Sequence, residues 1–244
     1  PTIAGVVLAY RKKYLLGGVI TALFIALQIQ SNHIQMSYYF MFVILFFIIA
    51  YFVDAYEKKE LPHFFKASAI LALAAVVGVC VNISNLYHTY EYSKETMRGK
   101  SELKQEGPAA NQTSSGLDRD YITNWSYGIG ETLTLLVPNV KGGGCSTTLS
   151  QNETAMAKAN PMYGNLYSQL TPYFGDQPWT AGPVYVGAFV VFLFILGCFI
   201  VKGPLKWALL GATIFSILLS WGKNFMGLTD FFIDYIPMYN KFRA

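Results

Sequence analysis

Charged residues are scarce in this chain. Of its 244 residues only 13% are Asp, Glu, Lys or Arg, which is about half the usual share in a soluble domain. Hydrophobic residues make up 53%, and the mean hydropathy is +0.35. The net charge of +4 lies mostly beside the apolar runs. It therefore indicates membrane topology and not a nucleic-acid partner.

Cysteine and histidine are also rare, and the familiar enzyme motifs are missing. Of three cysteines, Cys80 and Cys198 lie in apolar runs and Cys145 lies in a polar loop. This pattern excludes a disulfide framework and a CxxC metal site. There is no GxGxxG, no Walker lysine loop and no HExxH. The sequence thus identifies no certain cofactor, although a divalent cation stays an open alternative.

The apolar residues fall in runs long enough to cross a membrane. A spanning helix needs about 20 such residues. We predict an all-α polytopic membrane protein with a partial first span at Pro1–Tyr10, since the chain begins with Pro and without a signal peptide, as an internal fragment would. The five full spans are predicted at Tyr14–Gln30, Met36–Val53, Phe64–Ser84, Gly182–Val201 and Leu205–Trp221.

The short loops predict the orientation of these spans. Three of them are basic, whereas the loop Ser31–Gln35 has no Lys or Arg. Basic short loops remain in the cytoplasm. We therefore expect four segments: transmembrane helices at 1–84, a large outer loop at 85–181, two transmembrane helices at 182–221 and an outer interfacial segment at 222–244. The basic residues are Arg11, Lys12, Lys13, Lys58, Lys59, Lys66, Lys202 and Lys206.

The polar segments have distinct predicted structures. Alternating charges over 86–106 predict a polar helix that continues outward from the third span. Residues 107–116 are small and polar and predict a linker. A short helix is expected within 151–170. Apolar residues at helical spacing over 224–243 predict an amphipathic interfacial helix that Pro237 ends.

The first candidate site is the outer turn between the first two full spans. Asn32, His33, Gln35 and Tyr39 crowd this turn. Polar groups at the rim of a helical bundle can hold a lipid head group, and an imidazole changes charge near neutral pH. The alternative interpretation is an ordinary interfacial belt, which accounts for the tyrosine better than for the other three residues.

The second candidate is Glu131, an isolated carboxylate in the apolar segment Gly128–Pro138. Such a carboxylate has a raised pKa or finds a cationic partner, and either property suits a general base or a cation ligand. The alternative is a carboxylate at a helix N-terminus. Both interpretations stay open from the sequence.

Three further residues are weaker candidates for substrate binding. His88 and Glu91 share a helix face at (i, i+3), which would orient the imidazole, although a solvated contact is the commoner outcome. Arg243 is an outer cation at the depth of a lipid phosphate, where simple head-group contact is the alternative.

Several stretches, in this order along the chain, resemble the YfhO family of bacterial membrane proteins, in particular Bacteroides-type members. That family is similar to glycosyltransferases of the GT-C fold, which use a sugar carried on a polyprenyl phosphate. The stretches are LQIQSNHIQMSYYF (27–40), ISNLYHTYEYSKETMRGKSEL (83–103), YGIGETLTLLVPN (127–139), GPVYVGAFV (182–190) and IPMYNKFRA (236–244).

The resemblance implies a transferase of the bacterial inner membrane whose large loop faces the periplasm. Its partners would be a polyprenyl-phosphate-linked sugar, an envelope glycan or lipid acceptor and membrane lipids. Glu131 and His33 would be catalytic, and Asn32, Gln35, Tyr39, His88, Glu91 and Arg243 would bind substrate. The key carboxylate of GT-C enzymes would precede Pro1. A flippase for lipid-linked precursors and a non-enzymatic assembly scaffold are the alternatives.

Overall fold

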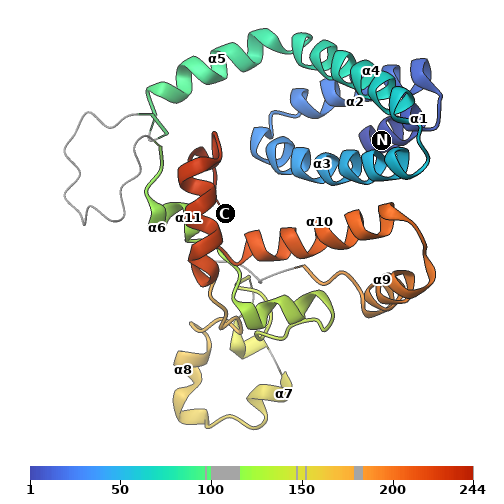
Figure 1. Ribbon diagram of the computed structural model, residues 1–244. Helices are drawn as coiled ribbons and strands as arrows, with labels where there is room; N and C mark the ends of the chain where they lie inside the picture. The colour runs from blue at the N-terminus through green and yellow to red at the C-terminus, as the bar shows by residue number, and fades with distance from the viewer. Residues whose placement is uncertain (97, 100–115, 147, 152, 179–183, 244) are drawn as a thin grey trace. The chain divides into compact units, whose positions relative to one another are not determined.

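The regular structure of the described residues is helical, and no strand occurs among them (Figure 1). Two helices, α3 (Ile34–Glu57) and α4 (Leu61–Cys80), are long and apolar enough to cross a membrane. A third crossing exists if α10 (Pro204–Ser220) and Gly222–Tyr235, which meet at 109°, form one broken span. The fold is therefore compatible with a membrane protein. The computed structural model describes residues 1–96, 98–99, 116–146, 148–151, 153–178 and 184–243.

Two of the predicted spans form shorter helices. The helix α2 (Tyr14–Gln30) has 17 residues, and α9 (Ala188–Ile200) has 13, whereas a membrane crossing takes about 20. Residues 182 and 183 of the fourth predicted run lie outside the described residues. The total of five spans and the GT-C fold stay predictions.

The chain divides into two compact units. Unit 1 comprises residues 1–99 and 201–214, and unit 2 comprises residues 100–200 and 215–244. Unit 1 contains α1 (Thr2–Tyr10), α2, α3, α4 and α5 (Ile83–Lys94). The helix α10 begins in unit 1 and ends in unit 2.

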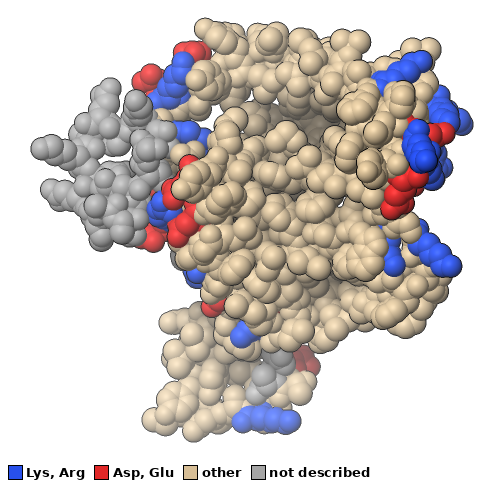
Figure 2. Space-filling view, in the orientation of Figure 1, with Lys and Arg blue, Asp and Glu red and all other residues tan. Residues whose placement is uncertain are grey.

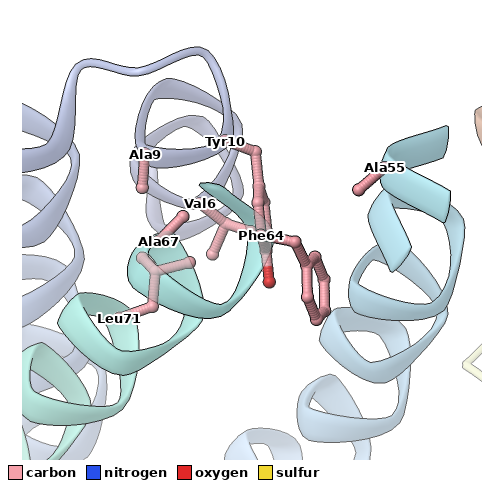
Figure 3. Close-up of a cluster of buried hydrophobic side chains, with 7 residues drawn as sticks. All are labelled: Val6, Ala9, Tyr10, Ala55, Phe64, Ala67 and Leu71. Atoms are coloured by element: carbon pink, nitrogen blue, oxygen red, sulfur yellow. The ribbon is translucent and has the colours of Figure 1, made fainter. Parts of the chain in front are cut away.

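The core of unit 1 joins α1, α3 and α4 (Figure 3). The ring of Tyr10 stacks on Tyr51 at 4.4 Å and on Phe64 at 5.5 Å between centroids. Such close packing holds helices together by van der Waals contact, which is a main attraction between helices in a bilayer. The cluster fixes α1 and the end of α3 against the start of α4, and its members are Val6, Ala9, Tyr10, Ala55, Phe64, Ala67 and Leu71.

The helices α1 and α2 approach each other through small residues. Gly5 and Ala9 on α1 face Gly17 and Thr21 on α2, and all four are buried. A Cβ atom at Gly17 would lie 2.5 Å from the backbone nitrogen of Ala9. Small residues four apart allow two backbones to come this close, which is a common mode of helix packing in membranes.

The basic loops meet at one end of unit 1. Lys12 forms a salt bridge with Glu60 at 3.0 Å, and this ammonium lowers the pKa of the Glu60 carboxyl. Lys58 pairs with Asp54 at 2.8 Å, and Asp54 lines a pocket of about 160 Å³ together with Lys202. Figure 2 shows basic side chains gathered at this margin. The membrane topology and the orientation of these loops stay predictions.

Short helices build unit 2, and Arg119 ties two of them together. Its guanidinium pairs with Asp230 and, at 2.6 Å, with Asp234. These two pairs join α6 to α11. The helical segments of unit 2 besides α9 are α6 (Arg119–Thr123), η2 (Ile129–Leu135), η3 (Leu149–Gln151), α7 (Glu153–Met156), η4 (Pro161–Tyr163), α8 (Gly164–Tyr167), η5 (Gly222–Phe225), α11 (Met226–Tyr235) and η6 (Tyr239–Lys241).

The polar segments follow the sequence in part. The helix α11 ends at Tyr235, two residues before Pro237, as predicted. The polar helix expected over 86–106 instead ends at Lys94, and it is separated from α4 by a turn at Val81–Asn82. Residues 107–115 of the predicted linker lie outside the described residues. The helices α7 and α8 lie within the segment expected to hold a short helix.

Candidate functional site

Glu131 lies at the centre of a hydrogen-bond network in unit 2. Its side chain is fully buried. One carboxylate oxygen accepts the backbone N–H of Gly128 at 2.7 Å. The other accepts the Tyr173 hydroxyl at 2.5 Å and the backbone N–H of Asp176 at 3.2 Å. Because a buried carboxylate is stable only when donors surround it, Glu131 fastens the segment 173–176 to the start of η2.

This geometry confirms one of the two interpretations of Glu131. It is the third residue of η2, and it accepts the N–H of the residue that precedes the helix, as a capping carboxylate does. Its catalytic role stays a prediction. Because both oxygens accept hydrogen bonds inside the unit, such a role would be exerted through the residues that Glu131 holds.

Among the residues that Glu131 holds by hydrogen bonds, Asp176 carries an ionisable side chain. Its backbone N–H donates to Glu131, and its carbonyl oxygen accepts the Lys223 ammonium at 3.3 Å. Its side chain is exposed, with one carboxylate oxygen packed against Gly128, where a Cβ atom would lie 2.6 Å away. The fold thus presents an exposed carboxylate and an exposed ammonium close together on the surface of unit 2, from segments 47 residues apart.

The network continues from Tyr173 to Arg243. Gln177 donates its N–H to the Tyr173 hydroxyl at 3.1 Å and its side-chain amide to the Trp125 carbonyl at 2.5 Å. The Arg243 guanidinium lies over the Trp125 ring at 5.8 Å and over the Tyr121 ring at 4.6 Å, and it donates to the Tyr121 hydroxyl. Two residues proposed separately from the sequence, Glu131 and Arg243, therefore belong to one network.

The outer-turn candidates lie in unit 1. Asn32 and His33 are exposed on the turn between α2 and α3, where Asn32 has a left-handed φ of 60°. Gln35 and Tyr39 are partly buried on the first turns of α3. The Tyr39 ring contacts the Tyr38 ring edge-on at 5.7 Å. This arrangement fits an interfacial belt as well as a head-group site.

His88 and Glu91 do not pair with each other. Glu91 instead pairs with Lys94 at 2.7 Å. Both side chains of that pair are roughly half exposed, and such a surface pair contributes only about 0.2–1 kcal/mol. The ring of His88 is exposed and lies edge-on to Tyr87. Glu91 thus belongs to a solvated ion pair and does not orient the His88 imidazole.

Nothing in the described part of the chain gathers three or more His, Cys, Asp or Glu side chains in a group that could hold a metal ion. The divalent-cation alternative for Glu131 therefore gains no support from its surroundings.

The Tyr127 hydroxyl provides a pH test of the network. Burial, and then the charge of Glu131, raise its pKa above 10.0. The neutral Tyr127 hydroxyl therefore makes its full contribution to stability below pH 10. This contribution is lost as the pH rises through the folded-state pKa, because the buried hydroxyl then ionises less readily than in the unfolded chain. Tyr127→Phe should therefore reduce the fall in unfolding free energy above pH 10, measured by denaturant titration at pH 8–11. An equal slope in Tyr127→Phe and in the exposed control Tyr163→Phe would contradict this.

Comparison with known proteins leaves the family open. No family model matches the sequence, and no curated protein or solved structure matches it. The YfhO resemblance stays a hypothesis that rests on the stretches quoted above.

Proposed function

We propose that this protein is a membrane glycosyltransferase that moves a sugar from a polyprenyl-phosphate carrier to a cell-envelope acceptor. The transfer takes place on the outer face of the bacterial inner membrane. The observation that carries the proposal is the exposed carboxylate of Asp176. The backbone of this residue is held on two sides, because its N–H donates to Glu131 and its carbonyl oxygen accepts from Lys223. Long apolar helices support a membrane location.

The proposed reaction assigns a role to each of these groups. Asp176 takes the proton from the acceptor hydroxyl while the oxygen of that hydroxyl bonds to the anomeric carbon of the donor sugar. The bond from that carbon to the lipid phosphate breaks, and the Lys223 ammonium stabilises the departing phosphate. Glu131 acts as a positioning residue for Asp176. Arg243 helps to shape the same part of unit 2 through Trp125 and Tyr121.

Charge placement in the long apolar helices favours this reaction over transport. Asp54 and Glu57 lie at the end of α3, and Lys66 lies near the start of α4. A proton-coupled transporter places ionisable residues near the middle of its spans. The transferase is therefore preferred over the flippase.

Mass spectrometry of envelope glycans and of polyprenyl-phosphate sugars tests the proposal. In cells without the full-length gene, one sugar should disappear from a polymer while its lipid-linked donor accumulates. Asp176→Asn should lower transfer about 100-fold or more, because general bases contribute at least this factor. Glu153→Gln, an exposed carboxylate on α7, is the matched control. Normal glycans in Asp176→Asn cells would remove Asp176 from the site.

A further inference from the structure

The short helix η2 and the residues next to it carry polar groups inside and apolar side chains outside. A 3₁₀-helix has about three residues per turn, so residues three apart share a face. Gly128, Glu131 and Thr134 form one such face, and all three are buried. Leu133 and Leu136 lie on another face and are 57% and 39% exposed. Folding in water buries apolar side chains, so this distribution is the reverse of that of a helix in a soluble protein.

The exposed apolar face of η2 continues onto the segment that leads into α9. Ile129 and Val137 flank the face, and both are more than half exposed. The backbone N–H of Val186 donates to the Leu135 carbonyl oxygen at 3.2 Å, which places residues 184–187 beside the end of η2. The helix α9 follows directly, and none of its 13 residues is charged or buried. A continuous apolar surface of this kind marks contact with a membrane or a partner.

The size of the exposed side chains favours lipid over another helix. Helices in membranes approach one another through small residues, as α1 and α2 do at Gly5 and Gly17. The exposed side chains of η2 are those of leucine and isoleucine, and α9 has no two small residues four positions apart. Lipid tails, which are as apolar as leucine, match such a surface without close contact between backbones.

The charged groups around η2 gather at its beginning. A carboxylate oxygen of Asp176 packs against Gly128, and the Lys141 ammonium reaches back to Gly130, where a Cβ atom would lie 3.9 Å from it. Residues 132–140 contain no charged residue. A lysine at the edge of an apolar surface extends its ammonium toward water in this way. The segment thus has a polar end and an apolar end.

The helix α9 is shorter than a membrane crossing. Its 13 residues measure about 20 Å, whereas the hydrocarbon core is about 30 Å thick. Residues 184–187 add at most about 13 Å, but they are not helical. Backbone of this kind lies at membrane depth only where protein groups satisfy it. The Leu135 carbonyl oxygen accepts the N–H of Val186, and the Tyr185 hydroxyl accepts that of Ala188 at 2.9 Å.

We propose that η2 and the turn after it form a re-entrant segment that enters the membrane beside residues 184–187. Its partner is the acyl chains of the bilayer, which contact Leu133, Leu136 and Val137. The seven residues of η2 span about 14 Å, and the head-group layer is about 5–8 Å thick. The end of η2 therefore reaches the hydrocarbon while Gly128 stays among the head groups. This placement is independent of the proposed transfer reaction.

The accessibility of nitroxide spin labels tests the proposal in the full-length protein, reconstituted into phosphatidylcholine vesicles. Oxygen dissolves in the acyl region, whereas a nickel chelate stays in water. The ratio of collisions with oxygen to collisions with the chelate should rise along η2 from its beginning to its end. The labels are attached to Ile129→Cys, Leu133→Cys and Val137→Cys, in a protein that also carries Cys80→Ala, Cys145→Ser and Cys198→Ala.

Met162→Cys is the matched control in water, and Phe192→Cys is the matched control in lipid. Met162 is an apolar residue of unit 2 that is 83% exposed on η4, away from α9 in the sequence, and Phe192 is exposed on α9. The ratio at Val137→Cys should exceed that at Met162→Cys at least about tenfold, because hydrocarbon excludes a polar complex. It should be close to that at Phe192→Cys.

Two results would overturn the proposal. Frequent collisions with the nickel chelate at Val137→Cys would place the face in water. Rare collisions with both reagents there would mean that another segment of the full-length chain, or a second copy, covers the face. Photolabelling of the unsubstituted protein by a phosphatidylcholine with a diazirine on its acyl chain gives an independent measurement, with label expected on residues 133–137 and not on Met162. Envelope glycans of Asp176→Asn cells test the transferase separately.

Discussion

Gly175→Ala is expected to lower the melting midpoint of the full-length protein by about 10 °C. A Cβ atom at this position would lie 1.6 Å from a carboxylate oxygen of Glu131 and 2.3 Å from the Tyr173 hydroxyl. Neither distance is possible between non-bonded atoms, so the network has to open. A buried charged group that loses a hydrogen-bond partner costs about 3 kcal/mol or more. For a chain of this size each kcal/mol lowers the midpoint by about 2–4 °C.

Gly164→Ala is the matched control for this measurement. Gly164 begins α8 in the same unit, and a Cβ atom there meets nothing within 4 Å. Alanine at this position should leave the midpoint unchanged or raise it slightly, because alanine favours the helical backbone. If Gly175→Ala and Gly164→Ala both have the melting midpoint of the wild type, then the Glu131 network does not contribute to the stability of unit 2.

The network also changes what Glu131→Gln is expected to do. From the sequence alone this substitution should lower activity with little loss of expression. In the structure, the amide group of glutamine would place two N–H donors where only acceptors fit. The variant should therefore lose stability as well as activity. Loss of activity in Glu131→Gln does not by itself identify a catalytic base, and Asp176→Asn is the sharper test.

The sequence singled out Glu131 but did not indicate its partners. An isolated carboxylate in an apolar segment signals burial, and burial requires donors. Which donors supply that need depends on the path of residues 173–177, and nothing in their spacing from Glu131 indicates it. Asp176 was missed for the same reason. Its only local signal is the preceding Gly175, whose missing side chain leaves room for the Glu131 carboxylate.

Hydropathy predicted α3 and α4 well, because a long apolar run in a helix has few alternatives. It predicted α9 less well. The predicted run there includes Gly182, Pro183 and Gly187, and the helix begins only at Ala188. At His88 and Glu91 the sequence left two alternatives, and the solvated one fits the structure, because the Lys94 ammonium pairs with the Glu91 carboxylate. Local spacing identifies which side chains can meet, and charge decides between them.

Gly17→Ala is expected to separate α1 from α2. A Cβ atom at Gly17 would lie 2.5 Å from the Ala9 nitrogen and 2.7 Å from the Gly5 carbonyl oxygen. Both are backbone atoms of α1, so no side-chain rotation can relieve the overlap. Alanine gains about 1 kcal/mol of helix propensity over glycine, whereas overpacking costs about 1–3 kcal/mol or more. Since the two backbones have to move apart, the cost of overpacking should exceed the gain in helix propensity. The packing of α1 against α2 should then be lost as well.

Gly18→Ala provides the internal comparison for that substitution. It brings the same gain in propensity on the same helix, but its nearest neighbour is the γ2 methyl group of Ile70 at 3.1 Å, a side-chain contact that a shift of a few tenths of an ångström relieves. Trypsin cleavage in the loop Arg11–Lys13 should accelerate several-fold in Gly17→Ala and stay near the wild-type rate in Gly18→Ala. Equal rates in the two variants would mean that the close approach of Gly5 and Ala9 to α2 does not hold α1 in place. A faster rate in Gly17→Ala alone would establish small-residue packing as the contact that fixes α1.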